Sequence, residues 1–192
     1  ADLNLPVRVH YSVDTYTRLW VGRFFPDTVT RVLYLDADLI AINGIGPLHA
    51  MDLDGNLLGA VSIPGSTRCE FLGIPAHFGY FNSGVMMIDL EQWRRTGAEA
   101  EVLAYVVANP EKLIDADQDA VNACFHARRK SLPFIWNVIS PFYFEYHPLG
   151  LDQLQLHGDL GHAGWEGEAR QPRFRLAGPV QGSHAVALDT QC

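Results

Sequence analysis

Two aspartates separated by one residue, Asp36 and Asp38, are the side chains of this sequence best suited to chemistry. They follow the apolar residues 32–35, a pattern typical of a buried strand that ends in charge. If the extended conformation continues, side chains two residues apart point the same way, so both carboxylates face one ligand. Adjacent carboxylates repel unless a cation or proton lies between them, and oxygen ligands suit Mg²⁺ or Mn²⁺. The alternative is a strand-end loop with solvated aspartates.

Composition limits the classes of partner. The 192 residues are enough for one domain with a substantial core. The formal net charge is -8, with only two lysines, which argues against nucleic acid as the main partner. Short basic runs at 94–95 and 128–130 are interpreted as solvated helix ends, although either could contact an anionic membrane surface.

Processing signals and cysteines indicate the setting of the chain. No apolar run approaches the ~20 residues that a membrane span needs. There is no signal peptide, and the sequence opens with Ala1, so we expect an internal portion of a longer protein. Cys69, Cys124 and Cys192 are widely spaced and fit neither a disulfide framework nor a zinc pattern, which favours a reducing, cytoplasmic compartment.

Hydrophobic periodicity predicts the elements that must position these side chains. Strands are expected at 5–13, 31–35, 57–63 and 85–90, helices at 14–25, 91–109 and 117–129, and a loop at 71–80. Alternating strands and helices predict an α/β fold with a mixed or parallel sheet. Residues 1–148 form the predicted domain. Residues 149–192 hold seven of the 17 glycines without clear period, and form a tail with little regular structure.

Four segments in order carry a resemblance to one family. They are Thr-Tyr-Thr-Arg-Leu at 15–19, Val-Leu-Tyr-Leu-Asp-Ala-Asp at 32–38, Phe-Asn-Ser-Gly-Val-Met-Met-Ile at 81–88 and Asp-Gln-Asp-Ala-Val-Asn at 117–122. Leu132-Pro133 and Trp136-Asn137 support them. Each motif alone is weak, but the ordered set over residues 5–140 resembles the retaining glycosyltransferases of family 8. That family includes bacterial lipopolysaccharide galactosyl- and glucosyltransferases and glycogenin.

The resemblance implies a GT-A type fold and a metal-dependent reaction. A hexose, galactose or glucose, moves from a UDP-sugar to a hydroxyl of a glycan or lipopolysaccharide-type acceptor, and its anomeric configuration is kept. Asp36, Ala37 and Asp38 correspond to the D-x-D segment that meets the donor, and the two aspartates hold Mn²⁺ (or Mg²⁺) together with the diphosphate. A divalent cation stabilises the charge that develops on that leaving group. The enzyme is expected in the cytoplasm, in peripheral contact with the inner membrane face.

The other motifs supply donor-binding residues by the same resemblance. Arg18 corresponds to the arginine that contacts the donor, and a guanidinium can bind two oxygens at once. Asn82 offers a donor and an acceptor to sugar hydroxyls, and Gly84 lets the backbone approach a ligand. Ser83 lies between them and is equally well explained as part of a strand-entry turn. The simplest alternative for Arg18 is a helix-surface position.

The segment at 117–119 is the expected reaction centre. The resemblance assigns Asp117 to the hydroxyls of the donor sugar and Gln118 to the side of its anomeric carbon. A glutamine is a feeble nucleophile, so it either stabilises an oxocarbenium-like centre or forms a covalent adduct. Departing UDP can itself assist the acceptor. A helix cap is the alternative for Asp117, and Asp119 fits a structural role better than its two neighbours.

Two departures from the family pattern affect the expected activity. Only 14 residues precede Thr15, so most of the segment that grips uridine is missing, and we expect weak or no turnover. The late H-x-x-G-x-x-K-P-W segment is also missing, since residues 149–192 contain no lysine. Its histidine is the third metal ligand of the family; His157, His162 and His184 are candidates here, and His162 is preferred. A truncated gene or a frame error would explain both losses.

Two other functions are compatible with parts of the sequence. A chain without its uridine pocket could be an inactive or binding-only remnant of the family. A haloacid-dehalogenase-type phosphohydrolase also ends a strand in D-x-D, but needs a later lysine and a second acidic pair, and Lys112 and Lys130 lie in poor contexts for that role. The remnant is the stronger alternative.

Overall fold

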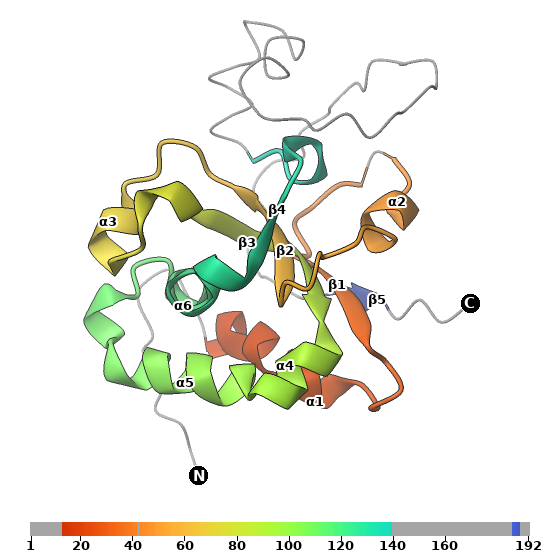
Figure 1. Ribbon diagram of the computed structural model, residues 1–192, viewed down its shortest axis with the longest axis horizontal. Coiled ribbons are helices and arrows are strands. Elements are labelled where there is room, and N and C mark those ends of the chain that lie inside the picture. The colour runs from red at the N-terminus through yellow and green to blue at the C-terminus, as the bar shows by residue number, and fades with distance from the viewer. Residues whose placement is uncertain (1–12, 42, 140–185, 189–192) are drawn as a thin grey trace, which may run out of the picture.

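The computed structural model describes residues 13–41, 43–139 and 186–188 (Figure 1). Nearly all of the strand expected at 5–13 lies outside these ranges, as do His157, His162, His184 and the division expected after residue 148. These expectations therefore stay predictions. No helix within the described ranges is long and apolar enough to cross a bilayer.

A mixed sheet forms the centre of the described chain. Its strands are β1 (Arg31–Leu35), β2 (Leu58–Ser62), β3 (Phe81–Asp89), β4 (Arg129–Leu132) and β5 (Val186–Leu188), in the order β4-β2-β3-β1-β5. β3 runs antiparallel to both neighbours, whereas β2 and β4 are parallel. The mixed sheet confirms the predicted α/β class. β5 comes from the predicted irregular tail, yet pairs antiparallel with β1 at the sheet edge.

The helices are short and several are interrupted. They are η1 (Val13–Trp20), α1 (Val21–Phe24), α2 (Gly46–His49), α3 (Arg68–Leu72), η2 (Ala76–Phe78), α4 (Leu90–Thr96), α5 (Ala98–Ala108), η3 (Pro110–Lys112), α6 (Ala116–Phe125), η4 (His126–Arg128) and η5 (Phe134–Trp136). The single helix expected at 91–109 is two, because Gly97 has φ 69° and ends α4 in a left-handed conformation. The loop expected at 71–80 holds the end of α3 and all of η2.

Two apolar clusters cover opposite faces of the sheet. Val32 and Tyr34 pack with residues of α4, α5 and α6, while Leu33 packs with Leu48 of α2 on the other face. Alternate residues of β1 therefore bury their side chains in clusters on opposite faces of the sheet, so both faces of this strand are covered. Asp36 follows on the side of Val32 and Tyr34, because its carboxylate accepts a hydrogen bond from the Tyr34 hydroxyl.

β3 begins earlier than the sequence suggests and is irregular at its start. Ala60 of β2 lies opposite Met86, but Ser62 lies opposite Phe81. β3 therefore advances by five residues where β2 advances by two, which marks a bulge or irregularity in β3. The segment 82–84, expected to precede the strand, lies inside this irregularity. Asn122 of α6 steadies it, since its side-chain amide accepts from the Phe81 amide and donates to the Phe81 carbonyl, both at 2.8 Å. A side chain here satisfies backbone groups that a regular ladder would pair.

Candidate active site

The buried guanidinium of Arg18 lies at the centre of the site. Its Nη1 donates to the Ser83 carbonyl at 2.8 Å and to Ser83 Oγ at 3.0 Å. Its Nη2 lies 3.0 Å from Asp36 Oδ1, and its Nε lies 2.7 Å from Asp117 Oδ2, an ion pair without hydrogen-bond alignment. The guanidinium carbon sits 4.6 Å from the centre of the Tyr34 ring. One side chain from η1 thus joins the end of β1, the start of β3 and the start of α6.

Electrostatics explains why this arginine can be buried. Loss of water lowers its pKa, but the charges of Asp117 and Asp36 outweigh that effect and the pKa is raised overall. A buried charge is tolerated when it is paired and hydrogen-bonded. Arg18 is therefore a buried crosslink, and the helix-surface alternative is wrong. A contact between Arg18 and the donor stays a prediction.

The carboxylate of Asp36 is held by one oxygen. Its Oδ1 accepts from Tyr34 at 2.8 Å and pairs with Arg18, while no described residue bonds its Oδ2. Burial raises the pKa of Tyr34, so its hydroxyl keeps the proton that it donates. Gly84 makes room for this carboxylate, because a Cβ there would lie 2.8 Å from Asp36 Oδ2 and 2.9 Å from Asn82 Oδ1.

Asp38 is placed differently from the expectation. The extended conformation ends at Leu35, and Ala37 and Asp38 lie in an exposed turn, so the alternation argument does not apply to this pair. The Asp38 charge nevertheless contributes to the raised pKa of Arg18, which places it within electrostatic reach of the buried cluster. The Asp36 carboxylate is thus held by Tyr34 and Arg18, whereas the Asp38 carboxylate is exposed to solvent nearby.

This pair suits a hard divalent cation. Asp36 Oδ2 and the Asp38 carboxylate are oxygen donors of the kind that Mg²⁺ and Mn²⁺ bind, and phosphate oxygens commonly complete such a site. Within the described ranges no group of three or more His, Cys, Asp or Glu side chains could hold a metal. The preferred third ligand, His162, lies outside the described residues.

Asp117 opens α6 in an unusual environment. It is buried, and the loss of water raises its pKa to about 6 against the opposing charge of Arg18, with the Asp36 charge adding to the rise. The preceding residue, Ala116, has φ 48°, a left-handed conformation that residues with a side chain rarely adopt. Backbone of this kind persists only where neighbouring contacts hold it.

Gln118 is held by hydrogen bonds at both ends of its amide, and Asn82 is held by two hydrogen bonds at its oxygen. Gln118 Oε1 accepts from the Ser83 amide at 3.0 Å, and its Nε2 donates to the Tyr80 hydroxyl at 3.1 Å. Asn82 Oδ1 accepts from the Gly84 amide at 2.8 Å and from Asn137 Nδ2 at 2.7 Å. The amide side chains are therefore oriented before any ligand arrives.

The structure brings most of the expected site residues together and adds others. Arg18, Asp36, Asp117 and Gln118 meet around Ser83, while Ala37 and Asp38 lie at the exposed edge. Sequence reasoning assigned no role to the residues that orient them, which are Tyr34, Arg68, Tyr80, Asn122 and Asn137. The sequence offers one clue to them, which is that all except Arg68 lie inside or next to the motifs named above.

The mixed sheet, flanked by helices and carrying this cluster at the end of β1 and the start of β3, defines a GT-A glycosyltransferase domain. A galactosyltransferase, LgtC, solved in complex with donor and acceptor sugar analogues, matches with a TM-score of 0.68 and 28% identity, covering 74% of this chain and 52% of that one. The sequence pattern of "Glycosyl transferase family 8" matches residues 2–157. The chain belongs to that family, which leaves no support for the phosphohydrolase alternative.

Relatives of known sequence agree with this placement. General stress protein A of Bacillus subtilis is 29% identical over 132 residues, which are 67% of this chain and 46% of that protein. The lipopolysaccharide 1,2-glucosyltransferase of Escherichia coli is 30% identical over 139 residues, 70% of this chain and 41% of that enzyme. The chain thus spans about half or less of the length of these relatives.

Proposed function

We propose that this chain carries the donor site of a retaining hexosyltransferase that uses a UDP-sugar and a divalent metal. The hexose is galactose or glucose, and the acceptor is a hydroxyl of a glycan or lipopolysaccharide-type molecule. The observation that carries the proposal is the cluster in which Arg18 joins Asp36, Ser83 and Asp117. Similar proteins named as a glucosyltransferase and a galactosyltransferase support the choice of a hexose.

The metal belongs to the D-x-D segment. Asp36 and Asp38 would hold Mn²⁺ or Mg²⁺, which when bound neutralises the diphosphate and stabilises the charge of the departing UDP. Arg18 and Tyr34 keep the Asp36 carboxylate in place through its Oδ1. Since the carboxylate is prepositioned, less ordering is needed when the donor binds.

The residues at the start of α6 act on the sugar. Gln118 presents a carbonyl oxygen that is already fixed by the Ser83 amide, so it can stabilise positive charge at the anomeric carbon. The Asp117 carboxylate accepts hydrogen bonds from sugar hydroxyls. Asn82 donates to them from Nδ2, since its Oδ1 already accepts two hydrogen bonds. Departing UDP takes the proton of the acceptor hydroxyl on the same face, which keeps the anomeric configuration. A cytoplasmic location with peripheral membrane contact stays a prediction.

A donor-consumption assay tests the proposal. UDP release from UDP-glucose and UDP-galactose is measured with and without Mn²⁺, for the native chain, Asp38→Ala and Glu91→Ala. Glu91 is an exposed carboxylate in the first turn of α4, which follows β3 at the end away from the site, and it is the matched control. We expect release to be weak and Mn²⁺-dependent, and to fall about tenfold or more in Asp38→Ala because a metal ligand is lost. Release that Asp38→Ala leaves unchanged would refute the metal assignment.

The same assay, combined with a titration of UDP binding, separates the alternative of a binding-only remnant. In that case UDP binds in a Mn²⁺-dependent way, but neither UDP-sugar is consumed with any acceptor offered. This outcome is worth measuring because the chain matches less than half of the length of these two relatives. Residues that complete the site in such proteins can lie in the part that is not matched.

A further inference from the structure

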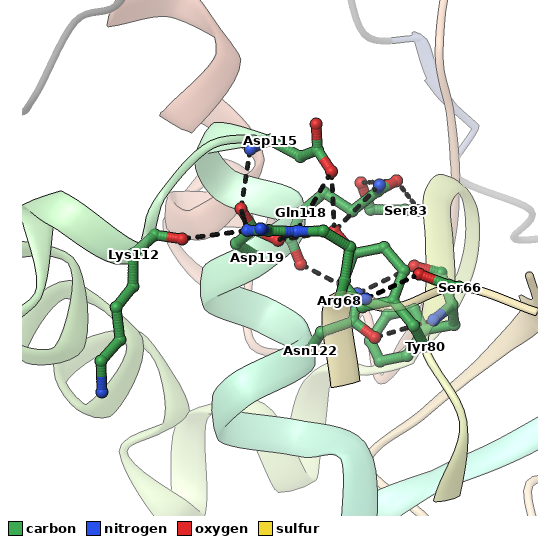
Figure 2. Close-up of polar contacts among 10 residues, drawn as sticks. Ser66, Arg68, Tyr80, Ser83, Lys112, Asp115, Gln118, Asp119 and Asn122 are labelled. Atoms are coloured by element: carbon green, nitrogen blue, oxygen red, sulfur yellow. Dashed lines mark hydrogen bonds and ion pairs between the residues drawn. The ribbon is translucent and has the colours of Figure 1, made fainter. Parts of the chain in front are cut away.

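A second charged cluster lies directly behind the proposed reaction centre, around the fully buried carboxylate of Asp119 (Figure 2). Arg68 binds it with two nitrogens, Nε at 3.1 Å from Oδ1 and Nη2 at 2.5 Å from Oδ2. Its Oδ2 also accepts from the Asp115 amide at 2.7 Å, and its Oδ1 accepts from the Tyr80 hydroxyl at 2.8 Å. Asp119 is therefore committed to protein partners on both oxygens.

The direction of each hydrogen bond in this cluster follows from chemistry. The Ser83 amide can only donate, so the Gln118 atom facing it must be the carbonyl oxygen. The Nε2 of Gln118 then faces Tyr80, whose hydroxyl must accept this bond and give its own proton to Asp119. The chain of donors runs from Gln118 through Tyr80 to Asp119, where Arg68 balances the charge.

Burial stabilises this series of hydrogen bonds. Tyr80 is 2% exposed and Asp119 is 0% exposed, so water cannot replace either partner without cost. Burial also raises the pKa of Tyr80, with the charge of Asp119 adding to the rise, so the hydroxyl keeps its proton. Arg68 in addition donates from Nη2 to the Lys112 carbonyl at 3.0 Å, which ties the segment before α6 to α3 (Figure 2).

We propose that Tyr80 is a positioning residue that locks the side-chain amide of Gln118, with Asp119 and Arg68 as its anchor. Tyr80 accepts from the nitrogen of the Gln118 amide, and Ser83 donates to its oxygen. The two hydrogen bonds together fix the rotation of the amide. The Gln118 oxygen, which accepts from the Ser83 amide at 3.0 Å and lies 3.4 Å from the Ser83 hydroxyl, is thereby held in one position. The catalytic consequence rests on the proposed function, whereas the locking of the amide does not.

Nuclear magnetic resonance tests the locking without reference to turnover. The side-chain amide protons of Gln118 are assigned by their loss in Gln118→Ala and followed in Tyr80→Phe, which removes one oxygen and keeps the ring. We expect a slowly exchanging proton pair in the native chain that exchanges at least about tenfold faster in Tyr80→Phe. Tyr105→Phe is the control, because the Tyr105 hydroxyl is buried without a hydrogen-bond partner among the described residues.

A second variant guards against a folding defect. Arg68→Lys keeps the charge but cannot hold both oxygens of Asp119, so it should loosen the Gln118 amide less than Tyr80→Phe does. An amide pair that is unchanged in both variants, with Tyr105→Phe also unchanged, would overturn the proposal.

Kinetics tests the consequence for catalysis. If the chain turns over, Tyr80→Phe should lower kcat about tenfold with little change in the KM for the UDP-sugar, because the donor is still bound. In the Gln118→Ala background the same change should have no further effect on kcat. Equal losses of kcat in both backgrounds would show that Tyr80 does not act through Gln118. If neither the native chain nor any variant releases UDP, the proposed function fails. The exchange measurement on the Gln118 amide still tests whether Tyr80 positions it.

Discussion

At the scale of single residues, the site depends on a balance of buried charges around Arg18. The guanidinium pairs with Asp36 and Asp117, and each pairing favours the charged forms. Burial of Asp117 acts in the opposite sense and raises its pKa to about 6. A carboxylate whose charged form is disfavoured by the fold is more typical of a functional site than of a structural one.

Asp117→Asn separates stability from function. The folded pKa of about 6 lies above the unfolded value of about 3.9, so between these pH values the folded state holds more protons. The Asp117 carboxyl therefore favours folding below about pH 4, and that contribution is lost as pH rises through 6. At neutral pH we expect Asp117→Asn to be more stable than the native chain, with less activity.

Denaturant unfolding at several pH values measures this effect. The advantage of Asp117→Asn should shrink as the pH falls from 7 toward 4, because the native carboxyl becomes neutral as well. Asp119→Asn is the contrast, because both Asp119 oxygens accept hydrogen bonds and an amide nitrogen cannot replace either of them. This variant should destabilise the fold by about 3 kcal/mol or more. A destabilised Asp117→Asn whose deficit does not change with pH would contradict the assigned balance.

At the scale of elements, the irregular start of β3 builds the cradle for Asp36. The Asp36 amide donates to the Gly84 carbonyl at 2.8 Å, so the two backbones approach closely where the register of β3 shifts. Only a residue without Cβ leaves the Asp36 Oδ2 atom its space. The shape of the strand, and not only the identity of the aspartate, thus prepares the site.

Gly84→Ala should disturb the cradle and leave most of the fold intact. The added methyl displaces Asp36 or Asn82, so we expect Mn²⁺-dependent UDP binding to weaken by about tenfold or more and unfolding free energy to fall by about 1–2 kcal/mol. Calorimetric titration of UDP checks the binding. Gly46→Ala is the control, because a Cβ there meets nothing within 4 Å. Equal binding by the two variants would disprove the role of Gly84.

The elements also show what sequence can predict. β1 was predicted with its observed bounds, because a short apolar run between an arginine and aspartates has few other interpretations. β4 was missed, since Arg129, Lys130 and Ser131 are polar and lie at a sheet edge. The start of β3 was misplaced because polar 82–84 resembles a turn, and its pairing depends on Asn122 from a distant helix. Contacts such as Tyr80 with Asp119 are 39 residues apart and leave no periodic signal.

At the scale of the whole molecule, the balance of charge favours the proposed metal. The chain has a formal net charge of -8, and the proposed donor site adds a held carboxylate and an open one to an anionic diphosphate. Arg18 cannot offset this alone, because Asp36 and Asp117 already pair with it. A net negative charge opposes the binding of an anionic diphosphate, and a bound cation would offset it.

Binding of Mn²⁺, followed by the paramagnetic resonance signal of the free ion, tests this central claim most directly. The native chain, Asp38→Ala and Glu91→Ala are titrated with Mn²⁺ in the presence and absence of UDP. We expect about one ion bound per chain when UDP is present, little without UDP, and loss of this binding in Asp38→Ala alone. Tight Mn²⁺ binding that needs neither UDP nor Asp38, or UDP binding that needs no Mn²⁺, would contradict the account.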